Sequence, residues 1–200
     1  DTLMAIEAFF AARGVQAEHE VSPLALGDAL GVLTAAGYEP FELTSVLYRP
    51  VAGGVAAPGD DAPATRAVDA DEADAWAEVA ADGWSDTPEV VPFVGAVGGV
   101  YVRMRSATCY VAEHHGEAAA TGVLAIHDGV AVLAGASTRP AFRRRGAQLA
   151  LLSARLDEAS SQGCDLAMMS ARPGSASQRN AERHGFRIAY TRIKWRRREP

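Results

Sequence analysis

The stretch STRPAFRRRGAQLALL, residues 137–152, carries the strongest structural signal in this chain. An apolar, strand-like run ends at Thr138, a proline breaks it, and an arginine-rich turn leads to Gly146 at the head of an amphipathic helix. The first turn of a helix presents unpaired N–H groups and a partial positive charge, which suit a phosphate or pyrophosphate. Gly146 and Ala147 leave room for such a ligand, and the guanidinium groups of residues 143–145 add positive charge. A solvated arginine turn before an ordinary helix is the alternative interpretation.

The distribution of charge supports a local anion site. The 200-residue chain carries a net charge of −6, but residues 1–138 hold 5 basic and 20 acidic side chains, whereas residues 139–200 hold 14 basic and 5 acidic ones. The two parts therefore have net charges of −15 and +9. The acidic part would repel a long polyanion, so we expect no nucleic-acid partner, in spite of the basic tail KWRRRE at 194–199.

Other features of the sequence exclude several classes of protein. Cys109 and Cys164 are the only cysteines, which predicts neither a disulfide framework nor a metal site, and each is expected to be a small core residue. No apolar run approaches the roughly 18–20 residues of a membrane span, so no membrane association is expected. The opening DTLMAIEAFF has no basic n-region and no cleavage site, which predicts a cytoplasmic protein without a signal peptide.

Strands and helices are expected to alternate after residue 64. Strands are predicted at 107–113, 119–127, 130–138, 164–170 and 186–196, with Asp128-Gly129 as a two-residue hairpin turn. Helices are predicted after Asp69 or Asp71, at 146–161, and after Ser175 or Ser177. Thr87-Pro88 favours a further helix, but the glycines at 95, 98 and 99 weaken that prediction.

The first 50 residues repeat this organisation in part. Helix, strand, helix and strand over residues 2–50 follow the same order as over residues 147–196, and GYEPFELTSVLYR at 37–49 aligns with GFRIAYTRIKWR at 185–196. The Gly- and Pro-rich residues 52–63 predict a linker. We therefore expect residues 1–51 to be the C-terminal half of one domain and residues 64–200 to be a complete one.

Two motifs resemble a known family, the GNAT acetyltransferase superfamily. A strand, then Arg-x-x-Gly, then a helix is similar to its acetyl-CoA signature, with Arg143 and Gly146 in place and Gln148 where the family usually has Gly or Ala. SQRNAERHGF at 177–186 is similar to the family's later helix that ends in Gly-Phe. The resemblance implies an α/β (α+β) GNAT acyl-CoA N-acyltransferase fold, with a mixed, mostly antiparallel sheet flanked by helices. The resemblance further implies that residues 1–51 form a partial N-terminal GNAT-like repeat before this complete domain.

The resemblance also implies acetyl-CoA as the cofactor. The backbone of Ser137 and Thr138 would pair with the pantetheine arm, and backbone N–H groups of residues 144–149 would cradle the pyrophosphate. Asn180 would lie beside the thiol end or the adenine side of CoA. The full set of expected cofactor-binding residues is Ser137, Thr138, Arg143, Arg144, Arg145, Gly146, Ala147, Gln148, Leu149 and Asn180.

The implied reaction is direct attack of a primary amine on the acetyl thioester, which requires a general base and a general acid. Many family members have a tyrosine acid on the later helix, but this chain has Ala181 there, so Tyr190 on the next strand is the candidate acid. Glu113, or the neighbouring His114 and His115, is the candidate base. The alternatives are a half-buried strand aromatic for Tyr190 and an exposed hairpin end for Glu113.

The acceptor would bind near Trp84, Asp86 and Glu89, since an acidic and aromatic lining suits a cationic amine, whether on a small molecule or on a peptide. A catalytically silent GNAT-like module that binds CoA or a partner protein is the alternative function. The sequence leaves a homodimer open.

Overall fold

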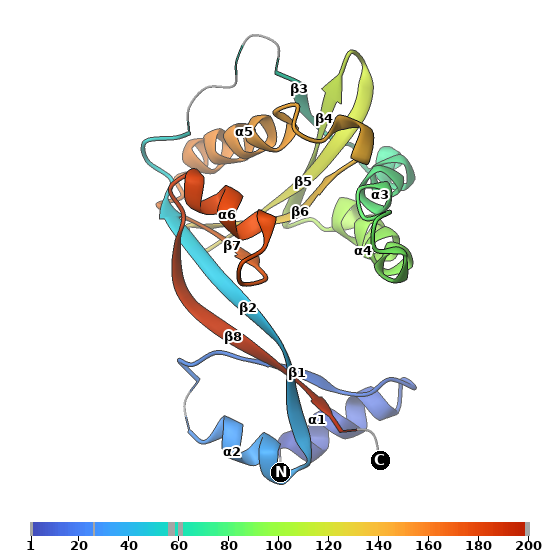
Figure 1. The fold of residues 1–200 in the computed structure, drawn as a ribbon, viewed down its shortest axis with the longest axis vertical. Coiled ribbons are helices and arrows are strands. Elements are labelled where there is room, and N and C mark those ends of the chain that lie inside the picture. Colours follow the sequence, from blue (N-terminus) through green and yellow to red (C-terminus); the bar gives the residue numbers. More distant parts are fainter. Residues whose placement is uncertain (1, 26, 56–58, 60–61, 199–200) are drawn as a thin grey trace. The chain divides into compact units, whose positions relative to one another are not determined.

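The computed structural model describes the chain except for residues 1, 26, 56–58, 60–61 and 199–200 (Figure 1). It divides into two compact units, Tyr48–Met169 and Asp1–Leu47 together with Ser170–Pro200. The predicted linker 52–63 lies partly outside the described residues, and the predicted boundaries of the two domains stay predictions. None of the described helices combines the length and apolar character that a bilayer span requires.

The larger unit is built on a mixed sheet in the order β3-β4-β5-β6-β7. Strands β3 to β6 pair antiparallel, and β7 runs parallel to β6. The bounds are Ala64–Ala67 for β3, Ala107–His114 for β4, Glu117–His127 for β5, Val130–Thr138 for β6 and Leu166–Ala171 for β7, whose last two residues belong to the smaller unit. The predicted mixed, mostly antiparallel sheet is confirmed.

Two tight turns connect the antiparallel strands. Asp128 and Gly129 have φ angles of 48° and 74°, so both adopt the left-handed conformation that a two-residue hairpin turn requires. This confirms the turn that the Asp-Gly dipeptide predicts between β5 and β6. His115 and Gly116 join β4 to β5 in the same way, with φ angles of 54° and 81°.

Strand β6 is irregular beyond its middle. It pairs with β7 only from Val130 to Val132, so within the described part of this unit the rest of β6 has no partner on that side. On its other side, the register with β5 shifts between Thr121 and Val123, and the opposing Gly135 has a φ of 58°. A Cβ at Gly135 would lie 2.5 Å from a methyl carbon of Val123, so this bulge requires glycine. The bulge thus bends β6 just before its free end.

Two helices cover one face of this sheet (Figure 1). The 3₁₀ turn η1 (Ala70–Glu72) leads into α3 (Ala73–Asp82), and η2 (Pro88–Val90) leads into α4 (Val91–Arg103). Trp76 of α3 is buried and donates to the carbonyl of Tyr110 at 2.9 Å. Helix α4 forms in spite of its glycines because Gly98 gives α3 room: a Cβ there would lie 3.1 Å from Cα of Ala77.

Helix α5 (Ala147–Ser161) packs on β4, β5 and β6, and the 3₁₀ turn η3 (Pro140–Phe142) precedes it. Its buried residues are Ala147, Ala150, Leu151, Leu152, Arg155, Leu156 and Ala159. The two cysteines are free buried thiols, as the sequence predicts, and burial raises the pKa of Cys109 to about 11.

The smaller unit contains a sheet in the order β1-β8-β2. Its elements are α1 (Thr2–Ala11), β1 (Glu18–Val21), α2 (Ala29–Ala35), β2 (Tyr38–Pro50, whose last three residues belong to the larger unit), α6 (Ala176–Arg183) and β8 (Arg187–Arg197). Side chains cap two of its helices, because Asp28 accepts from the N–H of Gly31 at 2.9 Å and Ser175 accepts from that of Gln178 at 3.1 Å. Of the two caps considered for α6, Ser175 is therefore the one used.

Acidic side chains of the first 50 residues neutralise much of the basic C-terminal strand. Lys194 pairs with Glu42 at 2.5 Å, and Arg197 pairs with Glu7 at 3.2 Å. The other pairs are Arg192 with Glu20, Arg196 with Glu39, and Arg198 with Glu39. Part of the positive charge after residue 138 is therefore used within the smaller unit and does not form an anion site.

The α3–α4 contact leads to a prediction about two glycines of α4. We expect Gly98→Ala to lower the free energy of unfolding by about 1–3 kcal/mol, because the new methyl meets the backbone of Ala77. Gly95→Ala should instead raise it by up to about 1 kcal/mol, since its Cβ meets only the Cβ of Ala81 at 3.8 Å and alanine favours helix. Urea unfolding of both variants measures the difference, and equal effects would contradict the packing described.

Candidate functional site

The loop between β6 and α5 has a backbone suited to an anion. After η3 the chain passes through Arg144 with a φ of 62° and Gly146 with a φ of 81°, and α5 begins at Ala147. An arginine with positive φ is uncommon and strained, and such residues gather at functional sites. Successive N–H groups in alternating conformations of this kind form a concave anion-binding nest.

The last N–H groups of this loop and the first ones of α5 have no acceptor among the described residues. The N–H of Arg143 donates to Pro140 at 3.3 Å, and that of Ala150 donates to Gly146 at 3.0 Å. Between them, none of the N–H groups of residues 144–149 has an acceptor among the described residues. Because they lie at the positive end of α5, an anion is the ligand that satisfies them best. The structure thus brings together the predicted residues Arg144 to Leu149.

Gln148 has a structural role that sequence reasoning did not foresee. Its Nε2 donates to the carbonyl of Ser137 at 2.8 Å and to Oγ1 of Thr138 at 2.9 Å. The side chain therefore points back to the end of β6, away from an anion at the helix terminus. Ser137 is fixed a second time, since its hydroxyl donates to the carbonyl of Ala80 at 2.7 Å. The predicted pantetheine residues Ser137 and Thr138 are thus tied to both α5 and α3.

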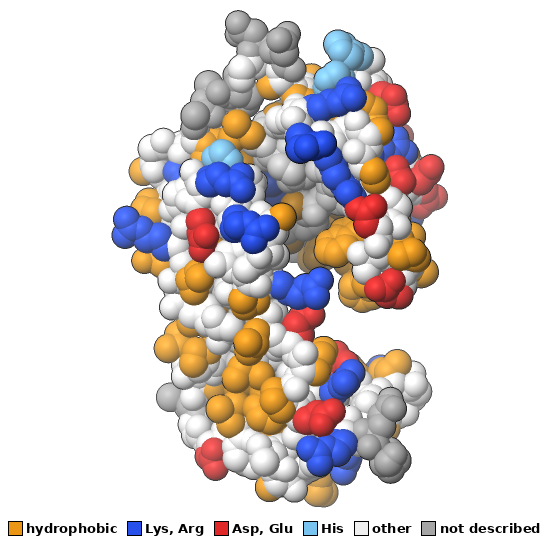
Figure 2. Space-filling view, in the orientation of Figure 1, with side chains coloured by type: hydrophobic (Ala, Val, Ile, Leu, Met, Phe, Trp, Pro, Cys, Tyr) orange, Lys and Arg blue, Asp and Glu red, His pale blue; other side chains and the backbone are white. Residues whose placement is uncertain are grey.

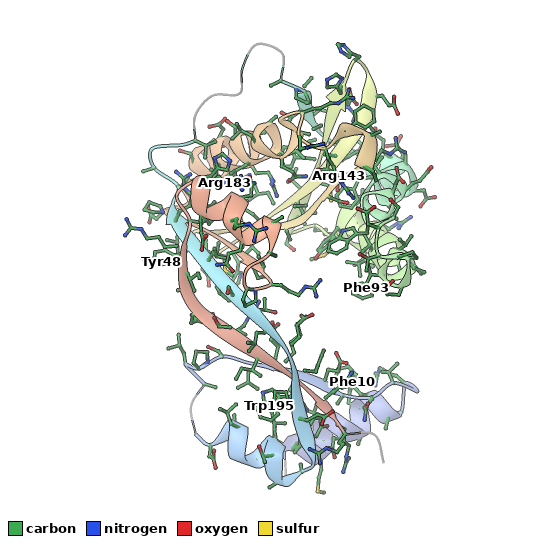
Figure 3. The ribbon with its side chains drawn as sticks, in the orientation of Figure 1. Phe10, Tyr48, Phe93, Arg143, Arg183 and Trp195 are labelled. Carbon is green, nitrogen blue, oxygen red and sulfur yellow. The ribbon has the colours of Figure 1, made fainter. Side chains whose placement is uncertain are left out.

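The three arginines of the loop have different partners. Arg143 forms a close ion pair with Asp86 and donates to the carbonyl of Gly83 at 3.0 Å (Figure 3). Arg145 lies over the ring of Phe142, 5.6 Å from its centre, and neither it nor Arg144 forms an ion pair with a described carboxylate. Figure 2 shows basic side chains gathered on this part of the larger unit. Arg144 and Arg145 are therefore the guanidinium groups free for an anionic ligand.

The predicted acceptor residues lie in the segment that joins α3 to α4. Trp84 is 40% exposed, and Asp86 and Glu89 are exposed as well. Because Asp86 pairs with Arg143, this segment is in direct contact with the predicted cofactor loop. The ion pair with Arg143 also neutralises Asp86, one of the two acidic residues expected to attract a cationic amine.

Glu113 is engaged in an ion-pair network at the end of β4. Its Oε1 accepts from Nε of Arg66 at 2.8 Å, and Arg66 also bonds Glu72 at 2.7 Å. The hydrogen bond from Arg66 lowers the pKa of Glu72. Oε2 of Glu113 has no partner in the described structure, so its role as a base stays a prediction.

Two predicted residues belong to the smaller unit. Asn180 is partly exposed on α6, next to the buried Ala181 that occupies the position of the family's tyrosine. Tyr190 is half-buried on β8. Their expected functions stay predictions. Among the described residues, no group of three or more His, Cys, Asp or Glu side chains could hold a metal ion.

Arg155 is the buried charged residue that sequence reasoning missed. Its side chain, in the middle of α5, is only 4% exposed. The signal was present, because Arg155 lies between Leu151 and Ala159 at helical spacing and therefore on the apolar stripe.

Comparisons with known proteins agree with this architecture. The family model described as "Acetyltransferase (GNAT) family" matches residues 71–186. The chain is similar to the structure of a GCN5-related N-acetyltransferase from Kribbella flavida, with 20% identity and a TM-score of 0.75 over 99% of this chain and 74% of that one. No curated protein matches the sequence.

Two further solved structures share the fold. One is a GCN5-related N-acetyltransferase from Sphaerobacter thermophilus, with 18% identity and a TM-score of 0.65 over 92% of this chain and 59% of that one. The other is a tandem GNAT protein from the clavulanic acid biosynthesis pathway, with 15% identity and a TM-score of 0.67 over 97% of this chain and 68% of that one. At these identities the likeness shows the fold alone.

The contacts of Gln148 lead to a stability prediction. We expect Gln148→Ala to lower the free energy of unfolding by about 1–2 kcal/mol, because two hydrogen bonds to the end of β6 are lost. The control is Gln162→Ala at the other end of α5, which removes an exposed bond to Glu158 and should change stability by less than about 0.5 kcal/mol. Equal losses in urea unfolding would show that the bonds of Gln148 do not stabilise the strand end.

Proposed function

Since the chain belongs to the acetyltransferase (GNAT) family, we propose that it is an acetyl-CoA-dependent N-acetyltransferase whose acceptor is a primary amine. The observation that carries the proposal is the set of N–H groups at residues 144–149, none of which has an acceptor among the described residues. They lie next to the guanidinium groups of Arg144 and Arg145, which form no ion pair with a described carboxylate. This donor set fits the diphosphate of CoA, because the N–H groups at the helix terminus and the two guanidinium groups each favour a small, doubly charged anion.

The strand before the loop fits the arm of the same cofactor. Beyond Val132, the backbone of β6 has no strand partner on the β7 side in the described unit. The carbonyls of Ala134, Gly135, Ser137 and Thr138 accept from side chains, so the groups left for pantetheine amides are the N–H groups that face away from β5. When bound, acetyl-CoA supplies an acetyl group activated as a thioester. The role of Ser137 and Thr138 is then to hold the arm in register, and their bonds to Ala80 and Gln148 keep that strand end rigid.

We propose that the acceptor amine loses its proton along a chain of waters that ends at Glu113, since Glu113 lies opposite Ala118 whereas Ala134 lies opposite Val123, five residues further along β5. We also propose that Tyr190 protonates the leaving thiolate. Oε2 of Glu113, which has no partner in the described structure, is the oxygen available for the first transfer. A half-buried phenol suits the second role, since Tyr can donate from the edge of an apolar surface. The α3–α4 segment with Trp84 and Glu89 would receive the acceptor.

A catalytically silent CoA-binding module is the second candidate. Two observations favour it: the buried Ala181 lies where many family members have a tyrosine, and Glu113 is bound to Arg66. Both candidates require the cofactor loop, and they differ only in turnover.

We also propose that residues 1–51 are the C-terminal half of a second GNAT-like domain. Helix, strand, helix and strand follow in the same order in α1-β1-α2-β2 and in α5-β7-α6-β8. The first strand of the earlier set, β1, pairs antiparallel with the last strand of the later set, from Glu18 with Arg196 to Val21 with Ile193. An exchange of closing strands between two related halves explains this pairing.

The cofactor proposal predicts the effect of charge reversal in the loop. We expect the double variant Arg144→Glu, Arg145→Glu to weaken acetyl-CoA binding at least about 100-fold in isothermal titration calorimetry, because two charge-assisted contacts become repulsions. The matched control Arg103→Glu, Arg105→Glu changes the net charge equally at the end of α4 and should bind as the unmodified protein does. Unchanged affinity of the loop variant would move the cofactor elsewhere.

Release of free thiol from acetyl-CoA, measured against a panel of primary amines, separates the two candidate functions. Turnover with any amine excludes the silent module. Tight binding without turnover across the panel would instead support it.

A further inference from the structure

Arg155 is a buried cation without an acidic partner among the described residues. No described carboxylate forms an ion pair with it, and burial lowers its pKa to about 10. A buried charge of this kind costs stability, and well-packed apolar residues can often replace even paired buried charges without loss. The fold alone therefore does not explain an arginine at this position.

The hydrogen bonds of Arg155 to described residues all go to backbone carbonyl groups, and its charge also interacts with the phenol of Tyr110. Nε donates to Leu151 of its own helix at 2.9 Å, while Nη1 donates to Val123 of β5 and to Ala134 of β6, each at 3.3 Å. The guanidinium group lies against Gly122, where a Cβ would come within 2.9 Å of Cζ. One nitrogen thus joins two neighbouring strands.

These two carbonyls flank the bulge of β6. The register between β5 and β6 shifts between Thr121 and Val123, and Gly135 on the opposite strand follows Ala134 directly. The hydroxyl of Thr121 donates to the carbonyl of Gly135 at 3.0 Å and fixes the other side of the same bulge. Arg155 therefore acts where β6 changes direction.

The bulge also has a defined place along the proposed cofactor site. The diphosphate would lie at residues 144–149 and the pantetheine arm at Ser137 and Thr138, so the acyl end would reach back along β6 toward residues 134–136. An acyl oxygen placed there would face the backbone of the bulge, whose N–H groups are its candidate donors. A positive charge beneath them, in a medium of low dielectric constant, favours negative charge on that oxygen.

We propose that Arg155 is a positioning residue for the acyl group, which holds the bulge of β6 in shape and adds uncompensated positive charge beneath it. This inference rests on the proposed function. It assigns to Arg155 a contribution that acts on the acetyl end of the cofactor and not on the CoA portion.

The test compares the affinities of acetyl-CoA and CoA by calorimetry, together with the thermal midpoint of unfolding. Arg155→Met should weaken acetyl-CoA about tenfold and CoA less than threefold, while the loss of its three hydrogen bonds lowers the midpoint. Arg155→Lys, which keeps the charge, should recover part of the selective loss. A purely structural role would weaken both ligands equally, and that result overturns the proposal.

A matched control is available in the same unit. Arg49 is also buried and donates to the backbone carbonyls of Pro50 and Gly54. Arg49→Met should leave the ratio of the two affinities unchanged, and an equal change of that ratio in both variants would overturn the proposal.

Three further outcomes are informative. If Arg155→Met does not fold, Gly122→Ala displaces the guanidinium group by contact and should produce the same selective loss of acetyl-CoA affinity. If the unmodified protein binds neither ligand, the proposed function fails, and this inference with it. If it binds both and neither Arg155→Met nor Gly122→Ala changes the ratio by more than twofold, only the inference about Arg155 is wrong.

Discussion

The site depends on the short parallel pairing between β6 and β7. The two strands pair only from Val130 to Val132, and β6 then bends at the Gly135 bulge. If the pairing continued, the backbone groups of β6 up to Thr138 would be satisfied by β7, and no ligand could use them. Because it stops, an open strand edge leads directly to the loop and to the positive end of α5. The proposed cofactor site is this edge and this helix terminus taken together.

The basic side chains of the chain fall into those that pair with a described carboxylate and those that do not. This difference matters more for an anion site than the net charge does. Basic residues of β8 pair with acidic residues of the first 50, and Arg143 pairs with Asp86. Arg144, Arg145 and the buried Arg155 have no described acidic partner, and all three lie in the loop or in α5. These three arginines therefore place positive charge near the open edge of β6. In the smaller unit, Arg172, Arg179, Arg183 and Arg187 also form no ion pair with a described carboxylate, so the unpaired charge is not confined to that edge.

Local patterns in the sequence were sufficient to predict most elements. Asp128-Gly129 specifies its hairpin because both residues tolerate positive φ, and the serine before α6 caps it. The turn from Pro140 to Gly146 could be predicted because proline, arginine and glycine each restrict the backbone locally. The family was inferred from the resemblance of two motifs, the Arg-x-x-Gly loop and the later helix that ends in Gly-Phe, and the mixed sheet was what that resemblance implied.

Contacts between residues far apart in the sequence could not be predicted from local patterns. The glycines of α4 suggested a weak helix, yet Gly98 is used for close packing on Ala77, which only the fold reveals. Gln148 seemed a departure from the family signature, and its bonds to Ser137 and Thr138 explain how the loop accommodates it. The pair of Arg143 with Asp86 joins residues 57 positions apart, so no local pattern could indicate it.

The central claim is that the N–H groups of residues 144–149 and the free edge of β6 bind acetyl-CoA. Backbone amide chemical shifts, measured by NMR during titration with acetyl-CoA, test it most directly. The account predicts that the largest changes fall on residues 144–149 and on Ser137 and Thr138, with little change at the β4–β5 turn. Saturable binding that leaves the amides of residues 144–149 unshifted would contradict it.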